Sequence, residues 1–264
     1  MNAIELSGVS LTFPTGHRAL SGLTLRVRAG SIFGFLGVNG AGKTTTIRTV
    51  AGLLRPDSGS VSLFGKEIVP GETEHLRSVG FVLDEPMYFE WMTPVEYWTF
   101  VAGMQRLEPS SARGRIEELL DFLDLSGKKD DAIATLSTGM RKKVSLGAAL
   151  IHRPELVILD EPLEGIDALA ASAIKSALTL AARQGTTVFI TSHVLDTVER
   201  FCTEIAILHE GALAFQCSTG EIATVALPSH PGRRFESLEA LFLAITSPGQ
   251  AGRSLGFLVD ERPA

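Results

Sequence analysis

The sequence predicts an α/β fold with a mostly parallel sheet, an antiparallel β subdomain and an inserted α-helical subdomain. Short apolar runs at 31–36, 156–159 and 187–191 have the composition of strands buried on both faces. Segments with helical spacing alternate with these runs. The chain has 264 residues, of which 45% are hydrophobic, so it can form one such domain if helices cover both faces of the sheet.

The first part of the chain predicts short strands on either side of one helix. We expect strands within 4–83 and a helix at 45–51. The next part, about 84–150, is predicted to be helical. One helix there should start at Thr93, which has Pro next to it and Glu three residues on, a capping-box pattern. Residues 114–123 repeat apolar side chains at helical spacing.

Strands and helices alternate again from 156 to about 208, and residues 209–216 predict a hairpin around Glu210 and Gly211. Beyond about 228 the chain is interrupted by Ser, Pro and Gly, and its role is not indicated. The predicted organisation is therefore a domain at 1–227, with the helical subdomain at about 84–150, followed by a tail at 228–264.

The most specific motif is GVNGAGKTT at 37–45, between the strand at 31–36 and the helix at 45–51. Its spacing is that of a phosphate-binding loop. The glycines let successive backbone N–H groups point at phosphate oxygens, and the helix N-terminus favours an anion. Lys43 supplies a positive charge for the outer phosphates and Thr44 a hydroxyl for Mg²⁺. The chain is therefore predicted to bind a nucleoside triphosphate.

Two adjacent carboxylates, Asp160 and Glu161, follow the apolar run at 156–159. Ligands of open α/β sheets bind at the carboxyl ends of parallel strands. Asp160 is expected to hold the Mg²⁺ shell and Glu161 to polarise a water molecule that attacks the γ-phosphorus. An acidic turn without a catalytic role is the alternative, and the phosphate-binding loop upstream disfavours it.

A third motif, LSTGMRKK at 136–143, lies between the other two. Ser137 is predicted to cap a helix that follows, and the exposed N–H groups of such a helix start form an anion site. An ordinary capped helix is the alternative interpretation. The order of these motifs, followed by Thr191-Ser-His193, resembles the ATP-binding-cassette (ABC) ATPases, and the resemblance covers about 4–216.

The resemblance implies an arrangement that the single motifs do not. In that family the signature motif of one subunit covers the γ-phosphate held by the loop of another, so a head-to-tail dimer, with identical or different subunits, is expected to enclose two ATP molecules. His193 matches the switch histidine that contacts the γ-phosphate, and Asp167 matches the loop that touches the opposite subunit. Phe13 matches an aromatic residue that stacks on adenine, although a core position is the alternative.

The predicted site residues fall into three groups. Glu161, His193 and Lys43 are the predicted catalytic residues, and Thr44, Asp84 and Asp160 the predicted Mg²⁺ ligands. The predicted ATP-binding residues are Phe13, Gly37, Asn39, Gly40, Ala41, Gly42, Lys43, Thr44, Thr45, Ser137 and Gly139.

Two departures from the family pattern affect this interpretation. Asp84 stands where Gln is usual, with Glu85 as the alternative alignment, and a carboxylate there adds negative charge beside the triphosphate. Thr138 and Met140 stand where Gly and Gln are common in the signature. Together with the basic residues that follow, they resemble the branch that exports drugs, antibiotics, sodium or polysaccharides.

Composition limits the partners and the location. There are 24 basic and 30 acidic residues, for a net charge of −6, which disfavours nucleic-acid binding through phosphate contacts. Cys202 and Cys217 lack metal-ligand spacing and are expected to be free thiols in a reducing compartment. We expect neither a spanning helix nor a signal peptide. A transport role would therefore need a separate permease.

These observations predict the ATPase subunit of an ABC exporter, bound to an integral membrane permease at the cytoplasmic face of the cell membrane. Tyr88, Phe89 and Trp91, in the aromatic run at 86–92, are predicted to line the docking groove, with a satellite core as the alternative. An importer subunit, a soluble cassette acting on ribosomes or DNA, and a non-hydrolysing cassette are the rival functions. The transported substrate is not predicted.

Overall fold

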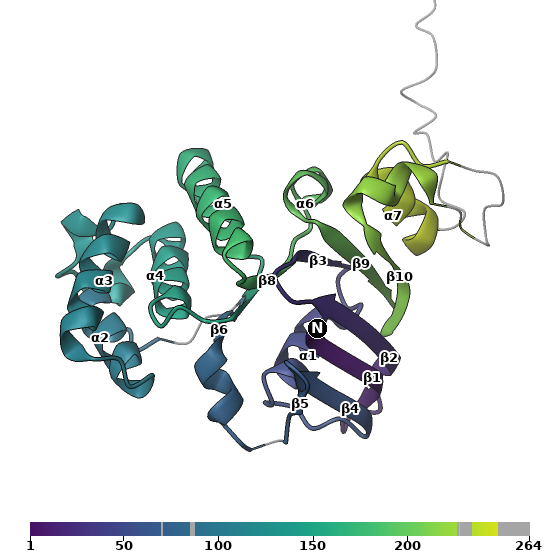
Figure 1. Ribbon diagram of the computed structural model, residues 1–264, viewed down its shortest axis with the longest axis horizontal. Helices are drawn as coiled ribbons and strands as arrows, with labels where there is room; N and C mark the ends of the chain where they lie inside the picture. Colours follow the sequence, from purple (N-terminus) through teal and green to yellow (C-terminus); the bar gives the residue numbers. More distant parts are fainter. Residues whose placement is uncertain (70, 85–87, 226, 228–233, 248–264) are drawn as a thin grey trace, which may run out of the picture.

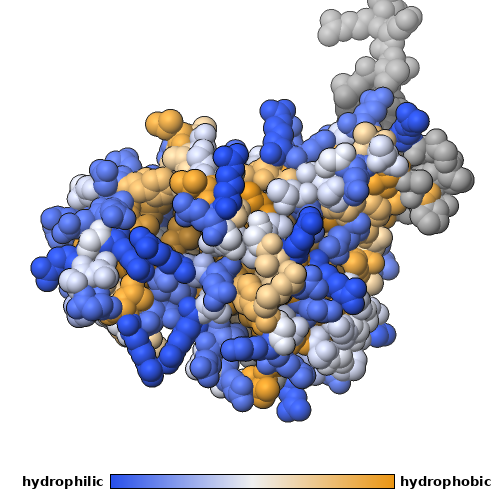
Figure 2. Space-filling view, in the orientation of Figure 1, coloured by the Kyte–Doolittle hydropathy of each residue, from blue (hydrophilic) through white to orange (hydrophobic). Residues whose placement is uncertain are grey.

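The computed structural model describes residues 1–247 except 70, 85–87, 226 and 228–233. Figure 1 shows a lobe that contains both sheets and, beside it, a helical lobe formed by α2, α3 and α4. Hydrophilic residues cover most of the face seen in Figure 2, with apolar residues gathered in smaller patches between them. None of the described helices has both the length and the apolar composition needed to cross a membrane.

The first sheet is antiparallel, with strand order β2-β1-β4-β5. It consists of β1 (Asn2–Thr12), β2 (Arg18–Arg28), β4 (Ser58–Leu63) and β5 (Lys66–Glu67). Along β1 and β2 most buried side chains are apolar and alternate with polar ones, as expected of a sheet with one face on a core. This is the predicted antiparallel subdomain.

The second sheet has six strands in the order β10-β9-β3-β8-β7-β6. All neighbouring pairs are parallel except β9 and β10, which form the hairpin predicted at Glu210 and Gly211. The strands are β3 (Ile32–Leu36), β6 (Val79–Val82), β7 (Leu156–Asp160), β8 (Thr187–Thr191), β9 (Glu204–His209) and β10 (Ala212–Ser218). Every residue of β3, β7 and β8 is buried, as the continuous apolar runs predicted.

The helices that pack on the parallel sheet outside the helical lobe are α1 (Lys43–Val50), α5 (Ala168–Arg183), α6 (Leu195–Phe201) and α7 (Leu238–Thr246). The prediction of a helix at 45–51 was therefore late by two residues. The left-handed conformation of Gly42 (φ 108°) ends the loop, so that Lys43 already belongs to the helix.

The helical lobe contains α2 (Pro94–Met104), α3 (Pro109–Phe122) and α4 (Thr138–Leu150), with short 3₁₀ turns at 126–128 and 133–135, and a further 3₁₀ turn at 74–78 leads into β6. Thr93 and Glu96 form the predicted capping box. The segment expected at 114–123 belongs to a longer helix, which Glu108 caps from before Pro109. The Trp98 indole donates a hydrogen bond to the Val144 carbonyl across 2.8 Å and thereby joins α2 to α4.

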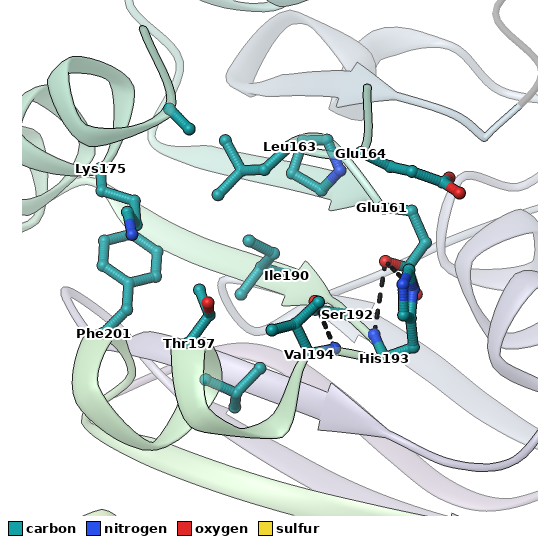
Figure 3. Close-up of a pocket in the computed structure, with 13 residues that line it drawn as sticks. Glu161, Leu163, Glu164, Lys175, Ile190, Ser192, His193, Val194, Thr197 and Phe201 are labelled. Atoms are coloured by element: carbon teal, nitrogen blue, oxygen red, sulfur yellow. Dashed lines mark hydrogen bonds and ion pairs between the residues drawn. The ribbon is translucent and has the colours of Figure 1, made fainter. Parts of the chain in front are cut away.

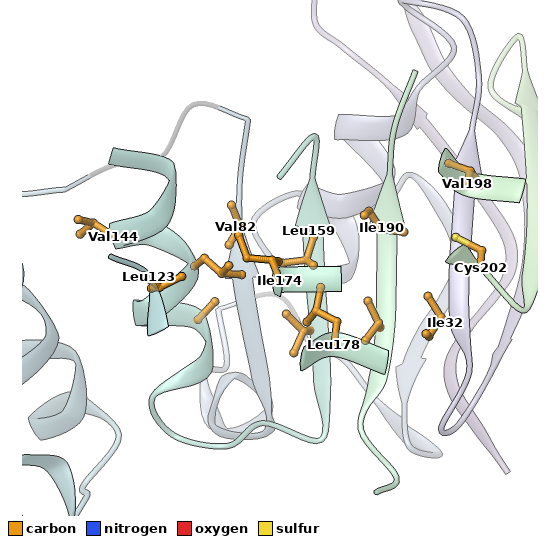
Figure 4. Close-up of a cluster of buried hydrophobic side chains, with 14 of the residues drawn as sticks. Ile32, Val82, Leu123, Val144, Leu159, Ile174, Leu178, Ile190, Val198 and Cys202 are labelled. Atoms are coloured by element: carbon orange, nitrogen blue, oxygen red, sulfur yellow. The ribbon is translucent and has the colours of Figure 1, made fainter. Parts of the chain in front are cut away.

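Two hydrophobic clusters hold these elements together. One packs the antiparallel sheet and α1 against one face of the parallel sheet, and includes Phe33 stacked on Phe189 with ring centroids 5.7 Å apart. The other joins the helical lobe, α5 and α6 to the parallel sheet (Figure 4). It also contains Phe235, Leu238 and Leu241, so the described part of the predicted tail packs on this core, while the boundary at 227 stays a prediction.

Candidate functional site

The loop 37–42 joins β3 to α1, and close packing requires glycine at two of its positions, 37 and 42. A Cβ atom on Gly42 would lie 2.6 Å from the Ala19 carbonyl oxygen, and one on Gly37 would lie 2.7 Å from that of Leu208. The Gly211 N–H of the β9–β10 hairpin donates to the Ala41 carbonyl across 3.0 Å. The loop is therefore held by the antiparallel sheet on one side and by the hairpin on the other.

Lys43 begins α1 and its ammonium group lies over this loop. Lys43 Nζ donates to the Gly37 carbonyl at 2.7 Å and contacts the Val38 carbonyl at 3.3 Å. Burial lowers the pKa of the amine, and the charges of Glu161 and Asp160 act in the opposite direction. A cation therefore lies over the loop and near the carboxylates of Asp160 and Glu161 at the end of β7, which β8 separates from β3.

Asp160 ends β7 and is almost entirely buried, with 3% of its surface exposed. Its two carboxylate oxygens are hydrogen-bonded to different hydroxyls, Thr44 Oγ1 at 3.2 Å and Thr191 Oγ1 at 2.5 Å. The parallel register sets Asp160 opposite Thr191, which fixes the second contact. A buried carboxylate is thus oriented toward the first turn of α1, where the sequence predicted a metal-ligating pair.

Thr44 and Asp160 offer the hydroxyl and carboxylate oxygens that suit Mg²⁺, which usually takes only one or two protein ligands beside phosphate and water oxygens. A cluster of three or more His, Cys, Asp or Glu side chains that could hold a metal is absent from the described residues. The donor chemistry therefore fits Mg²⁺ bound together with a phosphate.

Glu161 follows Asp160 in a left-handed backbone conformation, φ 45°, that is rare for a residue with a side chain. The Thr191 hydroxyl supports this turn by accepting the Glu161 N–H at 3.1 Å. The turn directs the Glu161 side chain to His193, whose backbone N–H and Nδ1 lie 3.4 Å and 3.1 Å from Glu161 Oε2 (Figure 3).

The environment of Glu161 alters its acidity. Burial raises the pKa of this carboxyl, and the His193 imidazole and backbone N–H and the Lys43 ammonium lower it. The effect of burial is the larger one, so the pKa of Glu161 lies above its ordinary value. When ionised, the group is therefore a stronger proton acceptor than an exposed glutamate. A basic carboxylate beside a histidine is the arrangement required for orienting an attacking water molecule.

The signature motif lies at the N-terminus of α4. Ser137 caps the helix as predicted, by accepting the Met140 N–H at 3.3 Å. Gly139 is pressed against the loop between β7 and α5, where an added Cβ would lie 2.5 Å from the Gly165 carbonyl oxygen. No hydrogen bond or ion pair between described residues connects Ser137 or Gly139 with the phosphate-binding loop of the same chain.

Two lysines of α4 make contacts that the sequence did not predict. Lys142 Nζ donates to the Glu161 carbonyl at 3.0 Å and pairs with Glu164 at 3.3 Å, and Lys143 Nζ lies 3.7 Å from the Asp167 carboxylate. Both lysine side chains are about 9% exposed. They bind the signature helix to the loop that carries Glu161, a role that a run of basic residues does not reveal.

Thr191 is the other residue whose role was missed, although its position offered a signal. It ends β8 beside β7, so a hydroxyl there must face the neighbouring strand's last residue, Asp160. A polar residue at the carboxyl end of an apolar parallel strand indicates a site residue, as do the carboxylates that end the neighbouring strand.

The remaining predicted residues lie after β1, in the phosphate-binding loop, in the first turn of α1 and after β6. Phe13 lies just beyond β1, half-buried against the antiparallel-sheet core, with its ring stacked on His17 at 6.5 Å between centroids. Asn39 is exposed in the loop, and Thr45 lies in the first turn of α1. Asp84 follows β6 at the same sheet edge, and no hydrogen bond or ion pair between described residues joins it to Thr44 or Asp160.

The aromatic segment is divided between two environments. Tyr88 packs edge-on against Tyr97 at 6.3 Å on the core side, whereas Trp91 is 73% exposed and lies 5.1 Å from the ring of Phe89. Glu85, Pro86 and Met87, which the prediction also covered, lie outside the described residues. A separate groove opens beside this segment, and its lining includes Phe81, Leu83, Tyr97, Val101, Ala148 and His152.

The chain is similar to known proteins over most of its length. Residues 20–164, more than half of the chain, match the family model described as ABC transporter. The chain belongs to the ABC transporter family. The bacitracin transport ATP-binding protein BcrA of Bacillus licheniformis is 34% identical over 75% of this chain and 64% of its own length. The daunorubicin/doxorubicin resistance ATP-binding protein DrrA of Streptomyces peucetius is 34% identical over 83% of this chain and 66% of its own.

The solved structures of this ABC family agree with the fold. One described as the structure of an ATP binding subunit of an ABC transporter has a TM-score of 0.85 and 28% sequence identity, and covers 92% of this chain and 99% of its own. The predicted fold class is confirmed. The chain spans only 61–66% of the length of the first curated relatives that it matches.

Proposed function

We propose that this ABC protein is the ATP-hydrolysing subunit of a transporter that powers a separately encoded membrane permease for export. The single observation that carries the proposal is the convergence of Lys43, Thr44, Asp160, Glu161 and His193 at one edge of the parallel sheet. A phosphate-binding loop alone fits many nucleotide-binding proteins. A buried metal-type carboxylate beside a basic carboxylate and a histidine fits hydrolysis of the bound nucleotide.

Each group has a role that follows from its position. The N–H groups of the loop and of α1 face the phosphates, and Lys43 leaves its loop carbonyls to offset their charge. Thr44 and Asp160 would hold Mg²⁺, which neutralises negative charge on the outer phosphates when bound. Glu161 accepts a hydrogen bond from the attacking water or removes its proton, and His193 fixes the carboxylate in place.

The signature motif is proposed to act on the nucleotide of a second cassette. Among the described residues, no hydrogen bond or ion pair joins Ser137 or Gly139 to the phosphate-binding loop of the same chain, yet the helix N-terminus they form favours an anion. A head-to-tail dimer, of identical or different subunits, gives each ATP one loop and one signature helix. Phe13 is proposed to stack on adenine, and Asp84 to hold a metal-bound water.

The permease is proposed to dock on the helical lobe and so to hold the chain at the cytoplasmic face of the membrane. The groove beside Tyr97 and the exposed ring of Trp91 supply apolar surface for one of its helices. The names of BcrA and DrrA, which specify bacitracin transport and daunorubicin/doxorubicin resistance, support export over import. We propose no nucleic-acid partner.

The central experiment compares Glu161→Gln with Glu164→Gln in the purified protein. Because Gln keeps the shape but loses the basicity, Glu161→Gln should reduce phosphate release from Mg·ATP by at least about a hundredfold and leave ATP binding intact. Glu164 belongs to the same loop but pairs with Lys142, so its variant should keep most activity. Normal turnover in Glu161→Gln would contradict the assigned role, and absence of turnover in the native protein with its copurified permease would favour a non-hydrolysing cassette.

A second experiment tests the partner. Affinity purification from detergent extracts should recover an integral membrane protein, and Trp91→Asp should weaken that recovery without altering ATP binding. Leu53→Asp is the matched control, since Leu53 is 63% exposed in the loop after α1, away from the helical lobe. Recovery of ribosomes or DNA in place of a membrane protein would instead support the soluble rival.

A further inference from the structure

A cavity next to the Glu161–His193 pair has no role in the function proposed above. It opens between α5 and α6 over the carboxyl end of β8 (Figure 3). Ala171 and Lys175, one helical turn apart, line it from α5, and Thr197 and Phe201, also one turn apart, line it from α6. Ile190 and Leu163 complete an apolar middle section.

The polar groups of this cavity are segregated by charge. In Figure 3, Lys175 lies at the end next to Phe201, and Glu161 and His193 lie at the opposite end. Glu164 lines the cavity as well, so its acidic groups come from the loop after β7. Within the described chain, neither the Lys175 ammonium nor the Thr197 hydroxyl has a hydrogen-bond or ion-pair partner. An apolar cavity with few convergent polar groups is the usual form of a small-molecule site.

We propose that this cavity binds an amphipathic monocarboxylate. The carboxylate would pair with Lys175 and accept a hydrogen bond from Thr197, since both donors lie at the end away from Glu161 and His193 and lack a partner among the described residues. The apolar body would lie over Leu163 and Ile190, and a single negative charge fits because Glu161 and Glu164 repel a second one at the other end. A phosphate ester or a dicarboxylate is disfavoured by the same two acids.

The proposal has a regulatory consequence that rests on the proposed function. The body of such a ligand would contact His193 and the first residues of the loop 162–167, which joins Glu161 to α5. Glu161 and His193 must adjust around a water molecule during hydrolysis, and the loop must reach the second cassette. A ligand bound between His193 and the loop 162–167 is therefore expected to slow ATP turnover without competing with ATP for the phosphate-binding loop.

Binding is tested by calorimetry on the full chain, with octanoate and 1-octanol as probes that share an apolar body and differ in charge. Octanoate should bind the native protein, and Lys175→Met should weaken it by about tenfold while changing octanol by less than about twofold, because only the charged contact is lost. Ala171→Phe should exclude both probes by filling the cavity. Lys66→Met, in the exposed strand β5, should change neither.

Two results would overturn the site: failure of octanoate to bind at millimolar concentrations, or unchanged octanoate affinity in Lys175→Met with folding verified by circular dichroism. The regulatory consequence is tested separately, by ATP turnover with and without octanoate. Slower turnover that Ala171→Phe abolishes would support it, and unaffected turnover would refute it while leaving the binding result intact. A native protein without ATP turnover in the presence of its copurified permease would refute the proposed function and leave the site to be decided by calorimetry.

Discussion

The N-termini of α1 and α4 are both predicted anion sites, and they differ in what surrounds them. At α1 the Lys43 ammonium donates to a carbonyl of the glycine loop, and Thr44 next to it donates to the buried Asp160 carboxylate. At α4 the Ser137 hydroxyl caps its own helix and Gly139 packs against Gly165. Among the cations of α4, Arg141 donates to the Leu136 carbonyl, and Lys142 and Lys143 are paired with groups of the loop at 161–167.

This difference shows that the two helix starts have unequal tasks. The α1 site has the charge and the metal-type oxygens for a triphosphate, so we propose that it binds the nucleotide by itself. The α4 site offers backbone N–H groups and one hydroxyl, and we propose that it recognises an anion that another site already holds. Lys142 connects it to the Glu161 carbonyl instead, and we propose that contact at α4 thereby affects the loop that carries Glu161.

The largest effect is expected when the α1 site loses its cation. Lys43→Ala should weaken Mg·ATP binding by about a hundredfold or more, because a charge close to the phosphates in a half-buried site is removed. Fluorescence titration with a labelled ATP analogue measures this. Arg48→Ala, an exposed position one turn further along α1, is the control and should bind normally. Unchanged ATP affinity in Lys43→Ala would contradict the unequal roles of the two helix starts.

The next effect distinguishes recognition from binding. Gly139→Val should reduce ATP turnover by about tenfold to a hundredfold, since its side chain collides with the Gly165 carbonyl and shifts the α4 N-terminus. Binding of ATP to the single chain should stay within about twofold of native in the same titration.

Gly114→Ala is the matched control for Gly139→Val, because a Cβ at Gly114 in α3 meets no atom within 4 Å. Its stability should rise slightly, by about 0.5–1 kcal/mol in urea unfolding, as Ala favours the helix. If Gly139→Val lost ATP binding in the single chain, α4 would belong to the same nucleotide site as α1.

The smallest effect concerns pH. Hydrolysis needs ionised Glu161, whose pKa burial raises and His193 lowers. Removal of the imidazole in His193→Ala takes away a lowering influence, so the pKa of Glu161 rises further. The acid limb of the turnover profile should then move to higher pH, and His193→Gln should give an intermediate shift. A limb that moves to lower pH would contradict the assigned charge balance.

Much of this comparison could be predicted from the sequence, because its motifs are local. The phosphate-binding loop, the strand that ends in Asp160 and the Ser137 cap each follow from residues close together in the chain. The link between the two sites could not be predicted, since Lys142 of α4 meets the Glu161 carbonyl across 19 positions of the sequence. Such contacts depend on strand register and helix packing. The cavity between α5 and α6 was likewise invisible, because it is lined by residues of several elements.

The most direct test is the mass in solution of the Glu161→Gln variant with Mg·ATP, compared with the same variant carrying Gly139→Val. If each nucleotide needs the loop of one chain and the signature helix of another, the first should have about twice the 28.2 kDa of one chain. The second should keep bound ATP and remain at the mass of one chain. A Glu161→Gln protein that stays monomeric with ATP bound, or a dimer that Gly139→Val does not disturb, would contradict the account.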